Sequence, residues 1–346
     1  MKNKQRRILI ARTDRLGDVV LSTPIAREIK KKYPDAFVAV LVRQYTKAVY
    51  EHNPYVDVIF TDDFSEDTRS KTFWERIKEL RKYKFTDALM LLPTERLNWM
   101  LFFAGIWNRI GVGHKLYQIL SFAKSVSRKK YIPLRHEADY CMDLARKIGV
   151  ESDNLATEIH LSDVEKVILE TRKEGYKSGK DILIGIHTTF GGSSPNVTPS
   201  VYREVIDELK KYSNIKIVIT DYDIPDAVKN IEEVIYLRHD IRDFFIDIAC
   251  LDLLVSSSTG PAHVAAALKV PTLTLFCPLP ACSPELWSPM GNDARYILPE
   301  ENYCSTKCPG DPKKCSFEGE GGIDAKKILD NIFKFIKERG ITPIQF

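Results

Sequence analysis

Two successive series of strand-like and helix-like segments constrain the fold of this chain more than any other feature. Short apolar runs alternate with amphipathic segments along the first half, and the same alternation starts again near residue 181. Apolar strands joined by helices form parallel sheets that are covered on both faces. The sequence therefore predicts an α/β fold. The expected strands cover residues 7–11, 37–42, 56–60, 87–92, 181–187, 215–220, 234–237, 251–255 and 272–276.

The length of the chain favours two domains, because 346 residues exceed the size at which one hydrophobic core stops growing. We expect Rossmann-like domains over residues 1–160 and 161–346, separated by a polar connection and a charged helix at 164–175. A final amphipathic helix at 323–339 completes the second domain or packs back on the first. Ligands of such sheets bind outside the carboxyl ends of the strands, so we expect a site in a cleft between two facing sheets.

The bulk composition excludes several classes of protein. A net charge of +4 is too small to indicate nucleic acid as a partner. No stretch approaches the ~20 apolar residues of a membrane span, and the first residues do not resemble a signal peptide. The longest apolar run, residues 99–107, suits a core helix, which we favour, or an interfacial helix that rests on a membrane. Seven scattered cysteines fit a cytoplasmic chain with mostly reduced thiols.

Two local features leave more than one interpretation open. Two basic runs are either solvated faces or contacts for an anionic partner. These runs contain Lys78, Arg81, Lys82 and Lys84, and Lys124, Arg128, Lys129, Lys130 and Arg135. Cys304, Cys308 and Cys315 would need a fourth ligand, such as Cys277 or Cys282, to bind a metal. Their spacing is not that of the usual zinc pairs, and we favour a plain reduced loop.

The segment at residues 255–268 is built to hold an anion. An apolar strand runs into the turn Ser258-Thr259-Gly260, which opens a helix of small residues. The amino end of a helix carries unbonded N–H groups and a partial positive charge, and both favour phosphate. The sequence therefore predicts a phosphate-binding turn here.

A second turn follows the first strand. Arg12 precedes this turn, Gly17 lies within it, and Asp18 stands at the start of a helix predicted over 19–32. Gly17 permits a tight or left-handed backbone. Asp18 is either a functional carboxylate or a helix N-cap, and Asp14 is equally eligible on spacing alone. The turn lacks the G-x-G-x-x-G fingerprint, which disfavours an NAD-dependent dehydrogenase.

Together these motifs resemble those of family-9 glycosyltransferases, the lipopolysaccharide heptosyltransferases and their relatives. The pairing of an early R-x-x-x-x-G-D turn with a late S-x-G-P-x-H-x-A-A-A-L segment carries the resemblance. Supporting marks extend it over nearly the whole chain. They are Arg109-Ile110-Gly111, Arg135-His136-Glu137, Ile184-Gly185-Ile186-His187, Pro199, the P-x-x-W-x-P-x-G run at 284–291 and the cysteine-bearing loop.

The resemblance implies a GT-B fold and an inverting transfer from a nucleotide-diphosphate sugar. It implies that Asp18, the acid of the G-D motif, is the catalytic base. Such a base takes the proton of the acceptor hydroxyl while the oxygen attacks the anomeric carbon, through a transition state with oxocarbenium character. The diphosphate would leave without a metal or another cofactor, stabilised by backbone N–H groups, hydroxyls and a helix end.

The resemblance also divides the remaining site residues between two ligands. Donor contacts are expected at Thr188, Thr189, Ser258, Thr259, Gly260, Pro261, Ala262 and His263. Acceptor contacts are expected at Arg15, Gly17, Arg96 and the basic residues 128–130. His263 is equally suited to support the loop, His187 is expected to be structural, and the nucleoside is expected around residues 220–222.

Two positions depart from the family pattern, both on the donor side. Ser258 stands where many members carry an Asp, and Asn196-Val197-Thr198 replace a basic residue and a Trp before the proline equivalent to Pro199. These departures weaken the case for ADP-heptose. A transferase with another nucleotide sugar and a nucleotide-binding protein with a decayed donor site are therefore the alternatives.

The resemblance thus implies a transferase that adds a sugar, with heptose as the leading candidate, to a lipopolysaccharide-type or other cell-surface glycan, and we expect it to be cytoplasmic. A phosphorylated glycolipid acceptor would suit the basic surface of the first domain. Contact with the inner face of the cytoplasmic membrane would follow.

Overall fold

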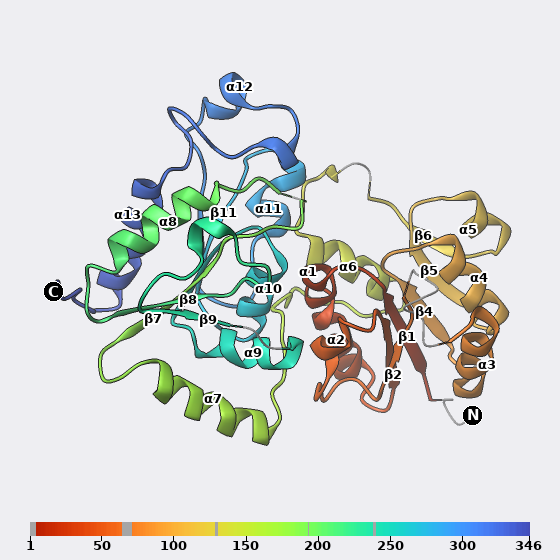
Figure 1. Cartoon of the computed structure of the whole chain (residues 1–346). Helices are drawn as coiled ribbons and strands as arrows, with labels where there is room; N and C mark the ends of the chain where they lie inside the picture. Colours follow the sequence, from red (N-terminus) through yellow and green to blue (C-terminus); the bar gives the residue numbers. More distant parts are fainter. Residues whose placement is uncertain (1–4, 64–70, 129–130, 193, 238–239) are drawn as a thin grey trace. The chain divides into compact units, whose positions relative to one another are not determined.

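The computed structural model describes residues 5–63, 71–128, 131–192, 194–237 and 240–346, which form two compact units (Figure 1). The first unit is Met1–His160 and the second is Leu161–Phe346. Each unit is built around a six-stranded parallel sheet. Among the helices of the described segments, none is both long enough and apolar enough to cross a bilayer.

The first sheet has the Rossmann strand order. Its strands are β1 (Arg7–Arg12), β2 (Phe37–Val42), β3 (Val58–Thr61), β4 (Asp87–Met90), β5 (Asn108–Val112) and β6 (Lys124–Val126). They are ordered β3-β2-β1-β4-β5-β6, with Ile8 opposite Val38 on one side and Asp87 on the other. The topology therefore reverses between β1 and β4, which is where such sheets bind ligands.

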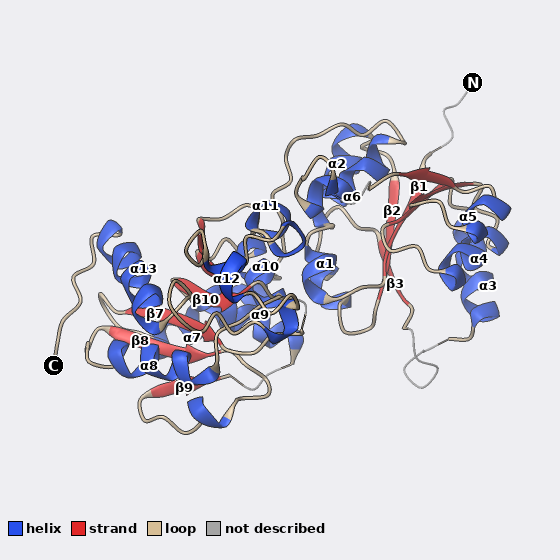
Figure 2. Cartoon of the chain, turned by 90° about the horizontal axis from the view of Figure 1, so that it is seen from above, coloured by secondary structure: helices blue, strands red, loops and turns tan. Residues whose placement is uncertain are grey.

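Helices cover both faces of this sheet. They are α1 (Leu16–Val20), α2 (Thr23–Lys32), α3 (Phe73–Tyr83), α4 (Glu95–Phe103), α5 (Leu116–Leu120) and α6 (Glu137–Arg146). Figure 2 shows α2 and α6 on one face and α3, α4 and α5 on the other. The prediction of one helix over 19–32 is wrong, because Pro24 has no N–H to continue a helix from α1 and instead occupies the first turn of α2.

The second sheet repeats the topology of the first. Its strands are β7 (Ile182–His187), β8 (Ile215–Ile219), β9 (Val234–Tyr236), β10 (Leu253–Ser257), β11 (Thr272–Leu275) and β12 (Ala294–Ile297). Their order is β12-β11-β10-β7-β8-β9, so the reversal lies between β7 and β10. The turns singled out from the sequence follow β1, β7 and β10, and all three therefore begin at a reversal point.

The helices of the second unit also lie on both faces of their sheet. They are α7 (Asp163–Tyr176), α8 (Pro199–Leu209), α9 (Ile241–Cys250), α10 (Gly260–Ala267), α11 (Pro284–Trp287), α12 (Tyr303–Lys307) and α13 (Ala325–Glu338). Helix α13 packs beside α8, and α7 packs beside α9. The apolar face of α13, with Ile328, Ile332 and Phe335 buried, lies in the core of the second unit.

Candidate active site

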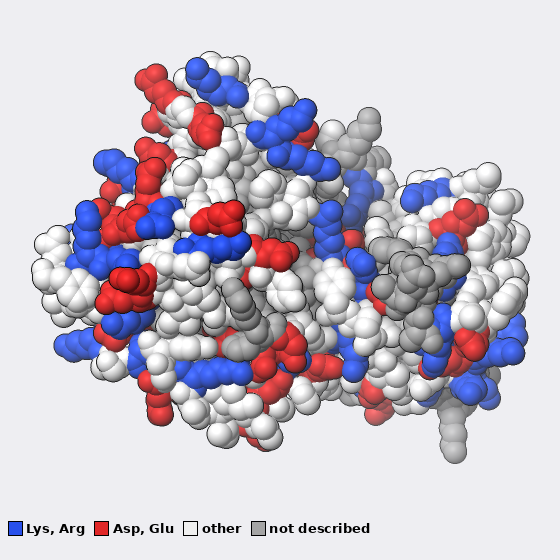
Figure 3. Space-filling view, viewed as in Figure 1, with Lys and Arg blue, Asp and Glu red and all other residues white. Residues whose placement is uncertain are grey.

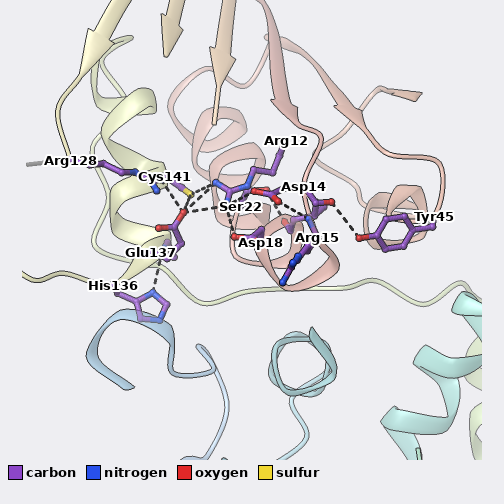
Figure 4. A network of polar contacts seen from close by, with 12 residues as sticks. Arg12, Asp14, Arg15, Asp18, Ser22, Tyr45, Arg128, His136, Glu137 and Cys141 are labelled. Atoms are coloured by element: carbon purple, nitrogen blue, oxygen red, sulfur yellow. Dashed lines mark hydrogen bonds and ion pairs between the residues drawn. The ribbon is translucent and has the colours of Figure 1, made fainter. Parts of the chain in front are cut away.

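The turn after β1 brings Arg12 and Asp18 together. Arg12 is the last residue of β1, and its side chain is buried. Asp18 lies in the first turn of α1 and accepts a hydrogen bond from Arg12 Nη2 at 2.6 Å (Figure 4). The Asp18 side chain is 18% exposed, against 4% for Arg12. A buried cation therefore holds this carboxylate, and solvent still reaches it.

Glu137, at the start of α6, completes the network on the other side of Arg12. Its Oε1 accepts from Arg12 Nη2 at 3.2 Å and from Arg128 Nη2 at 2.9 Å. The Glu137 side chain is only 1% exposed. The sequence motifs marked Arg12 and Glu137 without giving either a role, because no local pattern shows that residues 125 positions apart meet.

The network changes the acid–base behaviour of its members. Desolvation raises the pKa of Asp18, Arg12 opposes this shift, and the negative charges of Asp14 and Glu137 add to it, so that the pKa lies above its ordinary value. Burial raises the pKa of Cys141 to about 12, so this neighbouring thiol is neutral. A carboxylate with a raised pKa that solvent can reach is suited to accept a proton.

The structure shows which of the interpretations of Asp18, Asp14 and Gly17 in this turn hold. Helix α1 begins at Leu16 after Arg15, so Asp18 lies inside the helix and is not its N-cap. Asp14 Oδ1 accepts from the backbone N–H of Arg15 at 2.9 Å and thereby stabilises the turn. Gly17 is buried within α1, and of the tight and left-handed conformations that a glycine permits there the left-handed one is not adopted.

The residues expected on the acceptor side make different contacts. Arg15 is exposed beside the Asp18 turn. Arg96 pairs with Asp62, with 3.1 Å between Nη2 and Oδ1, and so belongs to a separate ion pair. Arg128 turns inward to Glu137. Residues 129 and 130 lie outside the described residues.

In the second unit, the turn after β7 surrounds a carboxylate of the protein itself. Asp221 accepts from the backbone N–H groups of Thr188 and Thr189 at 2.9 and 2.8 Å. It also accepts from their hydroxyls at 2.9 and 2.6 Å. The Asp221 side chain is fully buried. The donor groups that were expected to contact a diphosphate therefore already have a carboxylate partner.

Two further side chains support this turn, of which Asn196 is buried and His187 is 12% exposed. Asn196 donates to the carbonyl of Thr188 at 2.7 Å and accepts from the hydroxyl of Tyr202 at 2.9 Å. His187 Nδ1 lies 3.1 Å from the hydroxyl of Thr220. Burial lowers the pKa of His187, although the charge of Asp221 opposes that shift. Asn196 therefore has a structural contact at a place where the family pattern carries a basic residue.

The other expected phosphate-binding turn follows β10. The hydroxyl of Ser194 donates to the carbonyl of Ser258 at 2.9 Å and anchors the turn. Thr259 precedes α10 and Gly260 begins it, with no acidic residue in the first helical turn. That first turn also contains Pro261, Ala262 and His263. The helix therefore directs its partial positive charge into this turn.

A cavity of about 360 Å³ opens at the carboxyl ends of β7, β8 and β9. It is lined by His187, Thr220, Tyr222, Leu237, Asp240, Ile241 and Phe244. A larger cavity of about 650 Å³ is lined by Ile182, Asp252 and Pro271, which lie at the amino ends of their strands. Ligands of parallel sheets bind at carboxyl ends, so the smaller cavity is the candidate site.

The described residues of the two units do not gather metal ligands. Within the described ranges, no group of three or more His, Cys, Asp or Glu side chains is arranged to hold a metal ion. All seven cysteines carry free thiols, and burial raises the pKa of Cys304 to about 12. The sequence-based expectation of departure without a metal overlooked an Asp-x-Asp triplet, which Asp221 and Asp223 form. The four hydrogen bonds from the Thr188-Thr189 turn occupy the first of these two carboxylates.

Comparison with known proteins identifies relatives along the whole chain. The model of glycosyltransferase family 9 (heptosyltransferase) matches residues 73–316. Lipopolysaccharide heptosyltransferase 2 of Salmonella typhimurium is 22% identical over 97% of this chain and 100% of its own length. A family-9 glycosyltransferase structure from Veillonella parvula has a TM-score of 0.79 at 19% identity, covering 98% of this chain and 99% of its own.

A second solved structure is similar over a comparable length. The ADP-heptose lipopolysaccharide heptosyltransferase II of Escherichia coli has a TM-score of 0.71 at 18% identity, covering 97% of this chain and 100% of its own. At such identities the likeness establishes the fold alone. The GT-B fold class with two parallel sheets that the sequence predicts is therefore confirmed.

Proposed function

Because the chain belongs to glycosyltransferase family 9, we propose that it transfers heptose from ADP-heptose to a lipopolysaccharide-type acceptor, with inversion at the anomeric carbon. Family membership makes the chain a glycosyltransferase. The proposed donor and acceptor are those stated in the names of two relatives, a lipopolysaccharide heptosyltransferase and an ADP-heptose transferase.

One observation carries the proposal. Asp18 is a partly exposed carboxylate at the reversal point of its sheet, and its pKa is raised by desolvation. We assign it the role of general base. The acceptor O–H bond breaks as Asp18 takes the proton, the oxygen forms a bond to the anomeric carbon, and the bond from that carbon to the diphosphate breaks to release ADP.

Arg12 and Glu137 position the base in this proposal. The Arg12 guanidinium donates to Asp18 at 2.6 Å and to Glu137 at 3.2 Å, so both carboxylates share one buried cation. Arg128 also donates to Glu137. Glu137 is too deeply buried to meet an acceptor. Its proposed role is to hold Arg12, and through Arg12 to orient Asp18.

The donor is assigned to the second unit. Leu237, Ile241 and Phe244 give the cavity of about 360 Å³ apolar walls that suit a purine ring. The proposed diphosphate contacts lie at the amino end of α10, in the segment 258–263. Thr188 and Thr189 contribute indirectly in this proposal, because Asp221 already occupies their donor groups.

The leaving diphosphate is proposed to depart without a metal. The dipole of α10 and the backbone N–H groups of the turn before it are the groups that stabilise the departing charge. On the acceptor side, Arg15 is the exposed cation beside Asp18 and suits an anionic glycan or glycolipid. A chelator should therefore leave the rate of transfer unchanged.

The test is thermal unfolding of the intact chain with ADP-heptose, ADP, UDP, GDP and NAD in turn, followed by mass spectrometry of the acceptor. A ligand at ~100 times its dissociation constant adds about 2.7 kcal/mol of stability. The proposal predicts a shift with ADP and ADP-heptose and an acceptor heavier by one heptose. A shift with UDP or GDP alone would assign a different donor, and binding without transfer or slow donor hydrolysis would identify a decayed site.

A further inference from the structure

One stretch of the first unit has an unusual charge. Residues 96–136 contain no Asp or Glu, although the whole chain has 47 acidic residues. The same stretch contains eight basic residues: Arg96, Arg109, Lys115, Lys124, Arg128, Lys129, Lys130 and Arg135. It includes α5 and nearly all of α4. A purely basic segment attracts anionic surfaces.

The same segment exposes large apolar side chains. Helix α4 carries Trp99, Phe102 and Phe103 at positions i, i+3 and i+4, of which Phe103 is exposed and the other two are half-buried. Leu97 and Leu101 face the core. Helix α5 presents three more at the same spacing: Leu116, Ile119 and Leu120, which are 70%, 61% and 58% exposed. Monomeric proteins rarely expose a contiguous apolar surface of this kind without a partner.

These side chains form one surface, which we name the α4–α5 surface. Ring contacts connect Trp74, Phe103, Trp99, Phe102 and Trp107 in a continuous series, with centroids 5.6 to 6.3 Å apart. Asn98 joins α5 to α4 by donating to the hydroxyl of Ser121 at 2.9 Å. The surface consists of Trp74, Trp99, Phe102, Phe103, Trp107, Leu116, Ile119, Leu120 and Phe122.

A buried arginine holds the two most exposed aromatic residues of the α4–α5 surface in place. The guanidinium of Arg109 donates to the carbonyls of Ile106 and Ser121, each of which directly precedes an exposed ring. Those rings are Trp107, 78% exposed, and Phe122, 83% exposed. Phe122 also has a φ of 58°, a left-handed backbone that is unfavourable for a bulky residue. An exposed aromatic ring at a strained position indicates a functional constraint.

Basic groups lie at the edge of this surface. Arg81 donates to the carbonyl of Phe103 at 2.8 Å. Lys115 directly precedes α5 and is exposed, as is Lys124 shortly after it. Figure 3 shows the part of the first unit over α4 and α5 as a largely uncharged surface, with both basic and acidic side chains beside it. Aromatic rings bordered by lysine and arginine are typical of surfaces that enter the interface of an anionic membrane.

We propose that the α4–α5 surface binds an anionic lipid bilayer, with Trp107, Ile119, Leu120 and Phe122 entering the interfacial region and Lys115 and Lys124 contacting acidic headgroups. The charge favours a bilayer over a second copy of this chain, because a like-charged basic rim would repel itself across a twofold interface. The inference rests on the proposed function only in that a glycolipid acceptor lies in a membrane. Binding to vesicles requires no turnover, so an experiment can contradict membrane binding without contradicting the proposed transfer, and the reverse.

The experiment is flotation of the full chain with two kinds of vesicle. One is made of phosphatidylcholine alone, and the other contains roughly one third phosphatidylglycerol. We expect binding to the anionic vesicles, a blue shift of tryptophan fluorescence, and weaker binding as salt is added. Three of the four tryptophans belong to the α4–α5 surface, so the emission reports on it directly.

Paired variants separate the apolar and basic contributions. Trp107→Ser with Ile119→Ser should weaken binding to anionic vesicles at least tenfold, because both side chains lose their contact with acyl chains. The matched control is Val164→Ser with Val167→Ser, two side chains on α7 that are 71% and 67% exposed.

Charge reversal at Lys115→Glu with Lys124→Glu should also weaken binding more than tenfold, because each basic residue near an anionic surface contributes about a factor of five. Lys313→Glu with Lys314→Glu, two exposed lysines of the second unit, should bind as the natural chain does. Transfer to a soluble acceptor should be unchanged in all of these variants.

Two results would overturn the proposal. One is failure of the natural chain to float with either vesicle. The other is a change from dimer to monomer in the variant that combines Trp107→Ser with Ile119→Ser while vesicle binding stays intact, since that result would assign the α4–α5 surface to a second copy.

Discussion

The two sheets have the same strand order, yet the carboxylates beside the turns that follow their first strands differ in exposure and in the number of their hydrogen-bond partners. After β1, Asp18 has one strong partner, the Arg12 guanidinium, and is 18% exposed. After β7, Thr188 and Thr189 donate four hydrogen bonds to Asp221, which is fully buried. The topology of the sheet therefore places a carboxylate at the carboxyl ends of the strands. The groups that hydrogen-bond to that carboxylate determine whether it is available for reaction or stabilises the fold.

Asp18→Asn should have the largest effect. Because the amide cannot accept a proton, we expect the rate of transfer to fall by about a hundredfold to ten-thousandfold. Binding of ADP, measured by calorimetry, should stay within a few-fold of the natural chain. Asp14→Asn is the matched control, because Asp14 lies in the same turn and is 24% exposed. An inactive Asp14→Asn beside an active Asp18→Asn would reassign the base.

Asp221→Asn should lower the stability of the protein more than it lowers the rate of transfer. The amide nitrogen cannot accept, so at least one buried donor of Thr188 or Thr189 loses its partner. We expect the free energy of unfolding to fall by about 2 kcal/mol in urea titrations. Asp223→Asn, an exposed neighbour, should be close to neutral. An Asp221→Asn protein as stable as the natural chain would contradict the claim that Asp221 stabilises the turn after β7.

Glu137→Gln should change the pKa of Asp18 while leaving Asp18 in place as the base. The negative charge of Glu137 raises the pKa of Asp18, so removing that charge should lower the pKa and move the acid limb of the pH–rate profile to lower pH. A weaker base should also reduce the limiting rate, by less than about tenfold. Asp143→Asn on the same helix, which removes a partner of Arg135, should leave the limb unmoved. A merely structural Glu137 would change stability and leave the limb in place.

The smallest effect should appear in the dependence of stability on pH. The folded-state pKa of Asp18 is raised, so stability should decrease as pH rises above the ordinary carboxylate value of about 3.9. The folded-state pKa of His187 is lowered, so stability should decrease as pH falls below about 6.5. Asp18→Asn should remove the first slope and His187→Gln the second in urea unfolding measured across this pH range. Loss of both slopes in one variant would show that the groups are not independent.

Much of the fold follows from local sequence patterns. The apolar run at 37–42 coincides with β2, and the expected helix at 164–175 lies within α7. The three strands that were not predicted are short, and two of them lie at sheet edges: β5, β6 and β12. Their sequences carry polar residues such as Arg109, whose buried guanidinium depends on carbonyls that only the folded chain brings together.

The site could be predicted only as positions along the chain. The turns after β1, β7 and β10 were expected from glycine, hydroxyl and acidic residues beside apolar strands. The partners were not, because Glu137 reaches Arg12 and Asp221 reaches Thr188 across long sequence separations. Ion pairing depends on tertiary distance, which a single sequence does not encode locally. The roles of Asp18 and of the donor residues are therefore predictions that experiments must decide.

The most direct measurement is the pKa of Asp18 itself, determined by NMR of labelled carboxyl carbons across a range of pH. That pKa is then compared with the midpoint of the acid limb in the pH profile of kcat/KM. Our account predicts that Asp18 titrates above the ordinary value of about 3.9 and that the acid limb has the same midpoint. It also predicts that the Asp18→Asn protein lacks the limb. A normal or depressed pKa for Asp18, or a limb that persists in the Asp18→Asn protein, would contradict its assignment as the general base.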